Sequence, residues 1–463
     1  MNFKQTLLAG AVAVSLGFVS SGAYALQEGE PNAEAQARAE ARAAQRSFAE
    51  RQRQTDNIDV GFRIPSPDEV ERARDSRRNQ AASEQVGRRI MQAFELYEEE
   101  DIPGAINILE GINTRTEYDT AYVNRFLGNL YAAGERAQDA INRLEQAIAP
   151  DILGFNDQEA AMLLVANLHL QEENFQQAVE NYRRWIQFTG RMDPDVFVRM
   201  ANAHMQMENY AQVVPLARKA RHYQMEPNRN PYILQFASLY ELQRMDESIE
   251  VLEEAVQAIP TEERWWAQLG MLYFQQERSD EALATMDLAY RAGFLSQQND
   301  FRALAQMFSN NMIPYRAAEV LRRHLESDDI DKTARNYSIA ASAYHSAREF
   351  EQANEMYVLA AENAESREDR HDYHRRRGNS LLLADNYAEA ARAFNAALET
   401  AESDDDGLGR VYMSLAEAYF YTERYTDAVR AAERAARYSD QRRNAESWAN
   451  YIRETAERRG VDI

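Results

Sequence analysis

Apolar residues recur along this chain with two periods, a short one typical of helices that bury one face and a long one of 34 to 38 residues. The long period is marked by a small residue, usually alanine. This residue is Ala105, Ala140, Ala178, Val213, Ser248, Ala282, Ala317, Ala353, Ala390 and Ala428. A long period of this size predicts pairs of helices that stack on one another, not a single globular core.

Nine of the ten units carry a second small residue in the first helix, which we expect to let the second helix approach closely. The fifth unit is the exception, because Phe236 occupies this position. Elsewhere the small residue is Ala93, Gly128, Ala166, Ala201, Gly270, Ala305, Ala341, Gly378 and Ala416. In the second helix, a bulky residue four positions after the period residue shares its buried face. In seven units this bulky residue is Leu144, Tyr182, Leu252, Met286, Leu321, Tyr357 and Phe394.

One unit reads Trp266-x-x-Leu269-Gly270-x-x-Tyr273 and continues with alanine at 282 and 289. This spacing resembles the tetratricopeptide repeat (TPR), and the resemblance covers residues 83–439. It implies an all-α fold, a right-handed α-solenoid of about ten TPR-like helix pairs whose first helices line the concave face. Residues 440–463 continue as a helical stretch and tail. Trp448 and Ile452 share one face of that stretch, which predicts a capping helix.

The N-terminus has the pattern of a secretory signal peptide at residues 1–25. Lys4 precedes an apolar run from Leu7 to Val19, and Ala23-Tyr24-Ala25 is the small-x-small pattern that signal peptidase reads. We therefore expect cleavage after Ala25 and a mature chain in the periplasm, with no membrane span after cleavage. The alternative is an uncleaved membrane anchor, although the apolar run is shorter than the roughly 20 residues that cross a bilayer.

Residues 26–82 form a polar extension rich in Ala, Arg, Glu and Gln, which we expect to be partly disordered or helical. Residues 32–54 can form a helix by local propensity, but Phe48 is their only large apolar side chain. Residues 58–65 alternate apolar and polar side chains. The main interpretation of the extension is a flexible tether. The alternative for residues 58–65 is a short extended segment that docks on a partner or on the solenoid.

Composition and charge narrow the possible partners. With 18 Gly and 11 Pro in 463 residues, the chain has few helix breakers. Its net charge of −23 argues against nucleic acid and anionic membrane surfaces as partners. Lysine occurs only at positions 4, 219 and 332, so arginine supplies nearly all of the positive charge. This pattern suits a salt-tolerant surface, and genome composition is the alternative explanation.

No catalytic pattern stands out, and we expect no enzyme activity and no cofactor. The chain has no cysteine, and therefore no thiol nucleophile and no disulfide. It also lacks a Gly-rich phosphate loop and a Gly-x-Ser-x-Gly elbow. His169 and His204 occupy the large packing position of their first helices, so we expect them to be buried. His371 and His374 have the spacing of metal ligands, but His374 takes the packing place of Trp266, and we expect no metal.

The candidate binding site is the concave face that the first helices line. In four units the position after the small residue is asparagine, whose carboxamide can both donate to and accept from an extended peptide backbone. Arg125 and Arg375 stand four residues before two of these asparagines. The candidate peptide-binding residues are Arg125, Asn129, Asn167, Asn202, Arg375 and Asn379.

This Arg/Asn spacing is similar to the Lys/Asn pair with which some TPR domains hold a terminal carboxylate. That clamp needs further basic residues from the next repeat, and the sequence does not show them in the matching positions. The alternative is that these asparagines are ordinary polar residues on a solvated helix face. Asn107 lies on a second helix, off the concave face, and is a natural control.

The layout of signal sequence, polar extension, repeats and cap is similar to that of periplasmic TPR proteins associated with TonB energy-transduction systems. The sequence from Arg125 to Tyr131 is also similar to sequences in those proteins. It implies a non-enzymatic scaffold that binds an extended protein segment in the concave groove. Its partners would be TonB-system components that serve outer-membrane transport. The alternative is an adaptor for envelope biogenesis, in peptidoglycan or polysaccharide assembly or export. The oligomeric state stays open.

Overall fold

The computed structural model describes residues 57–77, 80–402 and 407–463. The signal peptide, its cleavage site after Ala25 and the predicted helix at 32–54 lie outside the described residues. Residues Ile58–Ile463 form one unit. Its described part contains 22 α-helices and no β-strand, which confirms the all-α prediction. Within the same part, no helix combines the length and apolarity that crossing a bilayer requires.

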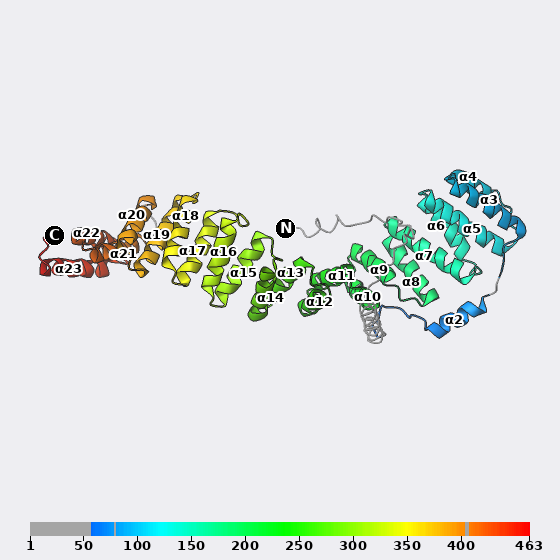
Figure 1. Ribbon diagram of the computed structural model, residues 1–463, viewed down its shortest axis with the longest axis horizontal. Helices are drawn as coiled ribbons and strands as arrows, with labels where there is room; N and C mark the ends of the chain where they lie inside the picture. The colour runs from blue at the N-terminus through cyan, green and yellow to red at the C-terminus, as the bar shows by residue number, and fades with distance from the viewer. Residues whose placement is uncertain (1–56, 78–79, 403–406) are drawn as a thin grey trace, which may run out of the picture. The chain divides into compact units, whose positions relative to one another are not determined.

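Ten pairs of helices follow one another along the chain, as predicted (Figure 1). The first helices of the pairs are α3 (Glu84–Glu98), α5 (Glu117–Ala133), α7 (Phe155–Gln171), α9 (Pro194–Gln206), α11 (Arg229–Glu241), α13 (Glu263–Gln275), α15 (Gln298–Asn310), α17 (Ala334–Ser346), α19 (Arg367–Leu383) and α21 (Leu408–Tyr421). The second helices are α4 (Ile102–Glu110), α6 (Ala137–Ile148), α8 (Phe175–Thr189), α10 (Tyr210–Tyr223), α12 (Met245–Ala258), α14 (Ser279–Ala292), α16 (Pro314–Glu326), α18 (Phe350–Glu362), α20 (Tyr387–Thr400) and α22 (Tyr425–Ala435).

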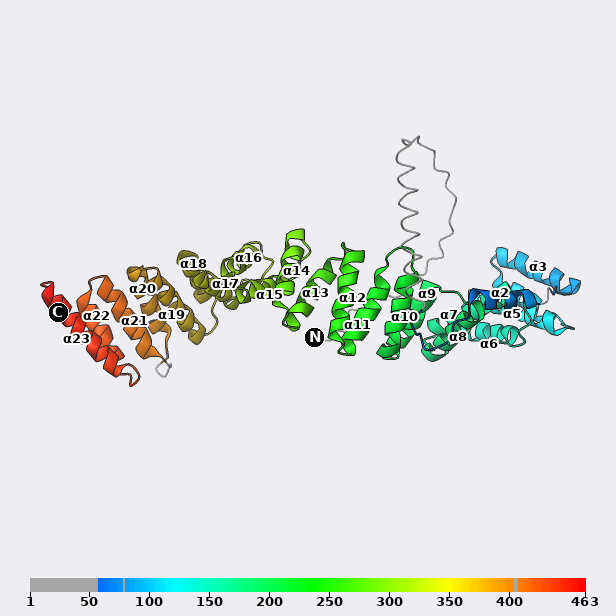
Figure 2. The same cartoon turned by 90° about the horizontal axis from the view of Figure 1, so that it is seen from below.

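Each helix packs mainly on the helices that precede and follow it in the sequence (Figures 1 and 2). Several first helices also contact the first helix of the next pair, as α13 contacts α15. The exposed side of the first helices therefore continues from one pair to the next. We call it the first-helix face.

The small residues sit where the helices of a pair approach most closely. A β-carbon added at Gly270 would lie 2.5 Å from Cγ of Met286, and one at Gly128 would lie 2.4 Å from Cγ of Leu144. Both neighbours are the bulky second-helix residues that the repeat pattern identified. All ten period residues, from Ala105 to Ala428, are fully buried. The predicted register of the repeats is therefore confirmed.

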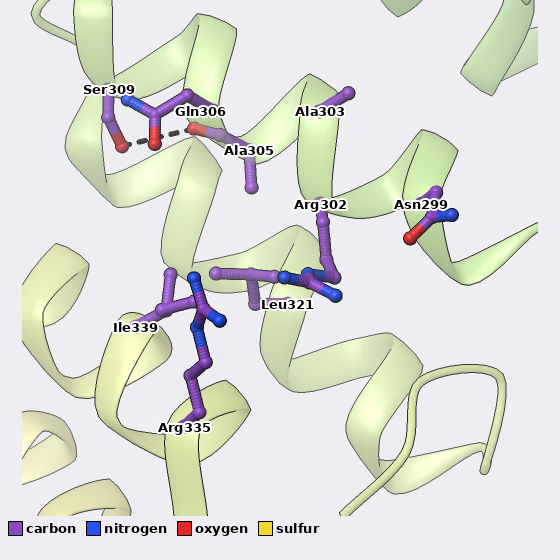
Figure 3. A pocket seen from close by; sticks show the side chains of 9 residues that line it. All are labelled: Asn299, Arg302, Ala303, Ala305, Gln306, Ser309, Leu321, Arg335 and Ile339. Carbon is purple, nitrogen blue, oxygen red and sulfur yellow. Dashed lines mark hydrogen bonds between the residues drawn. The ribbon is translucent and has the colours of Figure 1, made fainter. Parts of the chain in front are cut away.

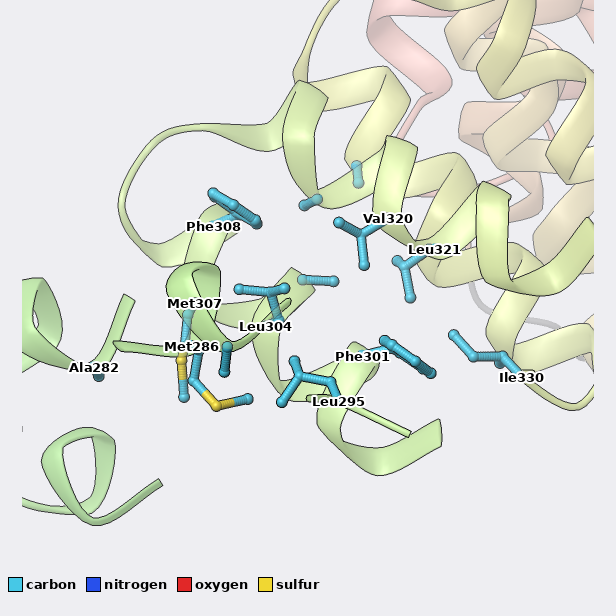
Figure 4. Packing of buried hydrophobic residues seen from close by; sticks show 14 of the residues in the cluster. Ala282, Met286, Leu295, Phe301, Leu304, Met307, Phe308, Val320, Leu321 and Ile330 are labelled. Carbon is cyan, nitrogen blue, oxygen red and sulfur yellow. The ribbon is translucent and has the colours of Figure 1, made fainter. Parts of the chain in front are cut away.

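Buried apolar side chains continue from one pair into the next. Figure 4 shows this around Met286 of α14, which packs near Leu304 and Met307 of α15. Both α15 residues are fully buried. This continuity is what stacked repeats require, because a single helix pair cannot bury its apolar face alone.

A left-handed residue ends the turn between the two helices of every pair. In the sixth pair this residue is Glu277, with φ of 59°, and the N–H of Arg278 donates to the carbonyl of Tyr273 at 2.9 Å. This is the Schellman pattern of helix ends. None of the ten left-handed residues is glycine. They are Glu100, Glu135, Glu173, Glu208, Gln243, Glu277, Met312, Arg348, Asp385 and Glu423.

The C-terminal helix α23 (Arg442–Arg458) packs on α22, as the predicted cap should. Ile452 is fully buried. Trp448 is half-buried, with its ring 5.2 Å from that of Phe420 and 5.3 Å from that of Tyr451. The face predicted from Trp448 and Ile452 is therefore the face that covers the last repeat.

Residues 58–77 pack against the repeats, so the tether interpretation is wrong for this part of the extension. Val60 is buried in the core that the N-terminal repeats share. The segment continues as α2 (Pro67–Ser76), which begins with a capping box at Ser66. Arg77 then donates from Nη1 to the carbonyl of Leu153 at 2.7 Å. The apolar side chains of the alternating segment pack on the N-terminal repeats, whereas those of a flexible tether would stay in water.

Candidate functional site

The predicted asparagines differ in how free their side chains are. Asn129 and Asn202 are exposed on the first-helix face, and Asn379 is half-buried there. Asn167 is also half-buried, and its Oδ1 accepts hydrogen bonds from the Tyr182 hydroxyl at 2.6 Å and from Arg199 Nη1 at 2.7 Å. Asn167 is therefore less able to hold a peptide than Asn129 or Asn202, since both lone pairs of its oxygen are already used.

The two predicted arginines are already paired within the chain. Arg125 forms an ion pair with Asp157 of the next first helix at 2.9 Å, and its guanidinium lies 4.8 Å from the Phe126 ring centroid. Arg375 forms an ion pair with Asp372, one turn earlier on the same helix. These cations are therefore neutralised and partly covered. They are poorly placed to hold a ligand carboxylate.

A cleft opens instead on the first-helix face between α15 and α17. It encloses about 320 Å³, and Figure 3 shows the side chains that surround it. Leu321 of α16 and Ala305 of α15 are buried at its apolar base. Its full lining is Asn299, Arg302, Ala303, Ala305, Gln306, Ser309, Leu321, Arg335 and Ile339.

The two arginines of the cleft point into the same space from different repeats (Figure 3). Arg302 is half-buried and Arg335 is exposed. Across the described part of the chain, neither guanidinium has an acidic residue within ion-pair distance or a hydrogen-bond acceptor. Their positive charge is therefore available to a ligand.

Neutral polar groups complete the cleft. Gln306 Nε2 donates to Asn310 Oδ1 at 2.7 Å, and Ser309 Oγ donates to the carbonyl of Ala305 at 3.0 Å. These bonds leave the Gln306 carbonyl oxygen and the Ser309 oxygen lone pairs able to accept. Asn299 is exposed at the rim. The cleft thus offers both donors and acceptors beside two cations.

The neighbouring first helices extend this character. Five positions of α15 at the cleft have equivalents in α13 and α17, found by aligning the repeats. These positions hold three arginines in all and no aspartate or glutamate. These positions are Arg264, Ala267, Gln268, Met271, Phe274, Asn299, Arg302, Ala303, Gln306, Ser309, Arg335, Ser338, Ile339, Ser342 and His345. The absence of acids at these positions is notable in a chain whose net charge is −23.

The histidines singled out by the sequence pack between helices. His169 is buried and His204 is half-buried, and burial lowers the pKa of both imidazoles. His371 is buried with Nδ1 2.8 Å from the carbonyl of Ala397. Burial, reinforced by the Arg377 charge, lowers the pKa of His374. Among the described residues, no three His, Asp or Glu side chains gather as a metal site would require.

No protein-family model matches the chain, and no curated protein matches it. Solved structures are similar in part. The C-terminal part of a TPR repeat-containing protein from Cytophaga hutchinsonii is 14% identical, with 53% of this chain and 97% of that chain covered and a TM-score of 0.37. YrrB, described as a TPR protein with an unusual peptide-binding site, is 16% identical over 36% of this chain and 84% of its own, with a TM-score of 0.30. Naa15/Naa10 bound to HypK-THB is 12% identical over 80% and 66%, with a TM-score of 0.44.

The assignment of the fold therefore rests on the repeat geometry of this chain. The cleft was not predicted, although one signal for it was present. Arg302 occupies the same place in its repeat as Arg125 and Arg375. Glutamine, not asparagine, follows Arg302 four residues later, so the Arg/Asn spacing does not single it out. Which of these arginines has an intramolecular acid partner could not be read from spacing alone.

Proposed function

We propose that this chain is a non-enzymatic scaffold that holds an extended protein segment against its first-helix face. The cleft between α15 and α17 is the principal contact. The observation that carries the proposal is the composition of this face from α13 to α17. It combines hydrogen-bonding amides and hydroxyls with exposed apolar side chains such as Met271 and Ile339, which are 41% and 37% exposed. Such a surface suits a peptide backbone with intermittent apolar side chains.

We also propose that the scaffold works in the periplasm, after cleavage following Ala25, as an accessory to a TonB-type system for outer-membrane transport. The signal-peptide pattern and the layout of the chain support this setting. Asn129 and Asn202 extend the proposed contact toward the N-terminal repeats, because both are exposed on the same face. Asn167 would contribute only as a donor through its amide nitrogen.

Site-specific photo-crosslinking in the native host tests this proposal. A photoreactive amino acid replaces Gln306 in the cleft, and a second variant carries it at Arg323, which is exposed on α16 and does not line the cleft. We expect protein crosslinks from position 306 that are absent from position 323. Mass spectrometry then identifies the partner. Crosslinks to envelope-biogenesis enzymes, and not to transport proteins, would assign the chain to envelope biogenesis. Equal crosslinking at the two positions would contradict binding of a segment at the cleft.

A further inference from the structure

We infer that the cleft between α15 and α17 recognises carboxylate groups of an acidic extended segment through Arg302 and Arg335. The inference rests on the proposed function and names the chemistry of its ligand. The candidate peptide-binding residues predicted from the sequence do not include these two arginines. They come from adjacent repeats and face one cleft.

Charge is the first argument. Two arginines of the first-helix face are neutralised by the chain itself, Arg125 by Asp157 and Arg375 by Asp372. Arg302 and Arg335 have no such partner in the described residues. In a protein of net charge −23, intramolecular acids are abundant, yet none stands at the cleft-lining positions of α13, α15 or α17. A ligand carboxylate would supply the missing counter-charge.

The surroundings strengthen such a contact. Leu321, Ala305 and Ile339 place apolar surface beside the guanidinium groups. Coulomb attraction is stronger beside apolar surface than in open water, because the effective dielectric constant is lower. A guanidinium also presents a planar fork of donors that matches the two oxygens of a carboxylate. Arg302 is half-buried, so part of its solvation has already been lost in the free protein.

The acidic residues of a partner and the carboxylate at the end of a chain share this chemistry. A cleft of about 320 Å³ holds a few side-chain groups at most, so one or two carboxylates would enter it while the segment continues along the face. Arg264 on α13 lies at the same repeat position as Arg335, but its charge already acts on the half-buried carboxyl of Asp300 on α15. The surface therefore favours a segment that places its carboxylates at Arg302 and Arg335.

Fluorescence anisotropy with defined peptides tests the inference on the full chain. The first probe is a short labelled peptide of alternating Glu and Ser with an amidated C-terminus. The second replaces every Glu by Gln, and the third is the Gln peptide with a free C-terminal carboxylate. We expect the Glu peptide to bind best, with affinity that falls as NaCl rises from about 50 to about 300 mM. Binding of the third peptide but not the second would assign the cleft to terminal carboxylates.

The double variant Arg302→Gln/Arg335→Gln should bind the Glu peptide about tenfold more weakly, because two charge-assisted contacts are lost. Arg323→Gln is the matched control, since it removes one charge outside the cleft. Circular dichroism and thermal melts establish that both variants are folded. Equal affinity of the Glu and Gln peptides, or an unaffected double variant, overturns the carboxylate assignment. Crosslinks from position 306 would in that case still support binding of a protein segment at the cleft. The two proposals can therefore be distinguished experimentally.

Discussion

At the scale of single residues, the tightest constraint is the contact between a glycine in the first helix and a bulky residue in the second. The Gly270 site has Met286 Cγ at 2.5 Å and Sδ at 2.8 Å from the place of a β-carbon. Alanine fills the same slot in six other repeats, Ala93 of the first pair included, so the helices of those pairs accommodate one carbon there. A larger side chain has no room without separating the helices.

Gly270→Leu should therefore lower the free energy of unfolding by about 1–3 kcal/mol, because the added side chain overpacks the contact with α14. Gly87→Leu on α3 is the matched control, since nothing lies within 4 Å of a β-carbon there. Chemical denaturation of both variants measures the difference. Equal stability of Gly270→Leu and wild type would contradict the close approach of α13 and α14.

The half-buried and buried histidines predict how stability changes with pH. Burial lowers the pKa of His169, His204, His345 and His374 below the ordinary value of 6.5. The folded chain then binds fewer protons than the unfolded chain once the pH falls below 6.5, so stability decreases on acidification. We expect melting temperature to fall from pH 7.5 to pH 6, and less steeply in His204→Gln. NMR titration giving these imidazoles a pKa of 6.5 or more would exclude this source of pH dependence.

The surroundings of a side chain are predictable from the sequence where the repeat dictates them. They are not predictable where its contact partners lie on another helix. The buried place of Ala282 follows from spacing alone, because each unit repeats the same contact. The state of Asn167 does not follow, because Tyr182 comes from α8 and Arg199 from α9. Arg302 differs from Arg125 only through its neighbours, since Arg125 forms an ion pair with Asp157 and no acid in the described part of the chain forms one with Arg302. Sequence spacing identifies positions, whereas partners decide what those positions can bind.

At the scale of the helix pair, the turns and the links between pairs share a common design. Tyr273 of α13 donates from its hydroxyl to Glu253 of the preceding pair at 2.5 Å, and Tyr344 of α17 does the same to Glu319 at 2.7 Å. Burial, reinforced by the carboxylate, raises the pKa of both phenols, so they stay protonated donors near neutral pH. The Arg278 guanidinium lies 4.5 Å from the Tyr273 ring centroid, next to the turn. Helix ends and pair-to-pair contacts are therefore fixed by the same residues.

The left-handed turn position offers a stabilising substitution. Glu277 is exposed and has φ of 59°, a conformation that costs an L-residue about 1–2 kcal/mol. Glu277→Gly should raise the free energy of unfolding by about 0.5–1 kcal/mol, because the removed strain exceeds the added freedom of the unfolded chain. Glu277→Ala keeps the strain and should give no such gain. Urea denaturation compares them, and a glycine variant less stable than the alanine variant would contradict the strained turn.

Segment 58–77 shows the limit of composition as a guide at this scale. Its charged residues suggested solvation, but Arg74 and Arg77 lie over the rings of Phe155 and Phe188, with distances of 4.6 and 4.7 Å to the centroids. The long arginine side chains cover apolar surface while their charged ends meet polar groups. A β-carbon at Gly190 would lie 2.8 Å from Val70 of α2, so the close fit involves backbone as well as charge. Polar composition alone could not reveal this complementary surface.

At the scale of the whole molecule, cooperativity should decay with distance along the repeats. Among the described helices, each pair packs mainly on its neighbours in sequence, and the buried apolar residues form several separate clusters. This also explains why the cleft-lining positions of α13, α15 and α17 can lack acids in a chain whose net charge is −23. Local faces can differ in charge because each is built by a few adjacent helices.

The capping helix provides the sharpest test of this locality. Removing residues 440–463 exposes the side of α21 and α22 that Ile452, Ala449 and Ala456 cover, all of them buried in the intact chain. The last pair then loses apolar burial worth a few kcal/mol, at about 1.5–3 kcal/mol for one large aliphatic side chain. Hydrogen exchange should become faster throughout α21 and α22 while α5 and α6 keep their wild-type protection. Uniform loss of protection from α5 to α22 would instead mean that the repeats unfold as one cooperative unit, and unchanged exchange in α21 would show that the last pair is stable without its cap.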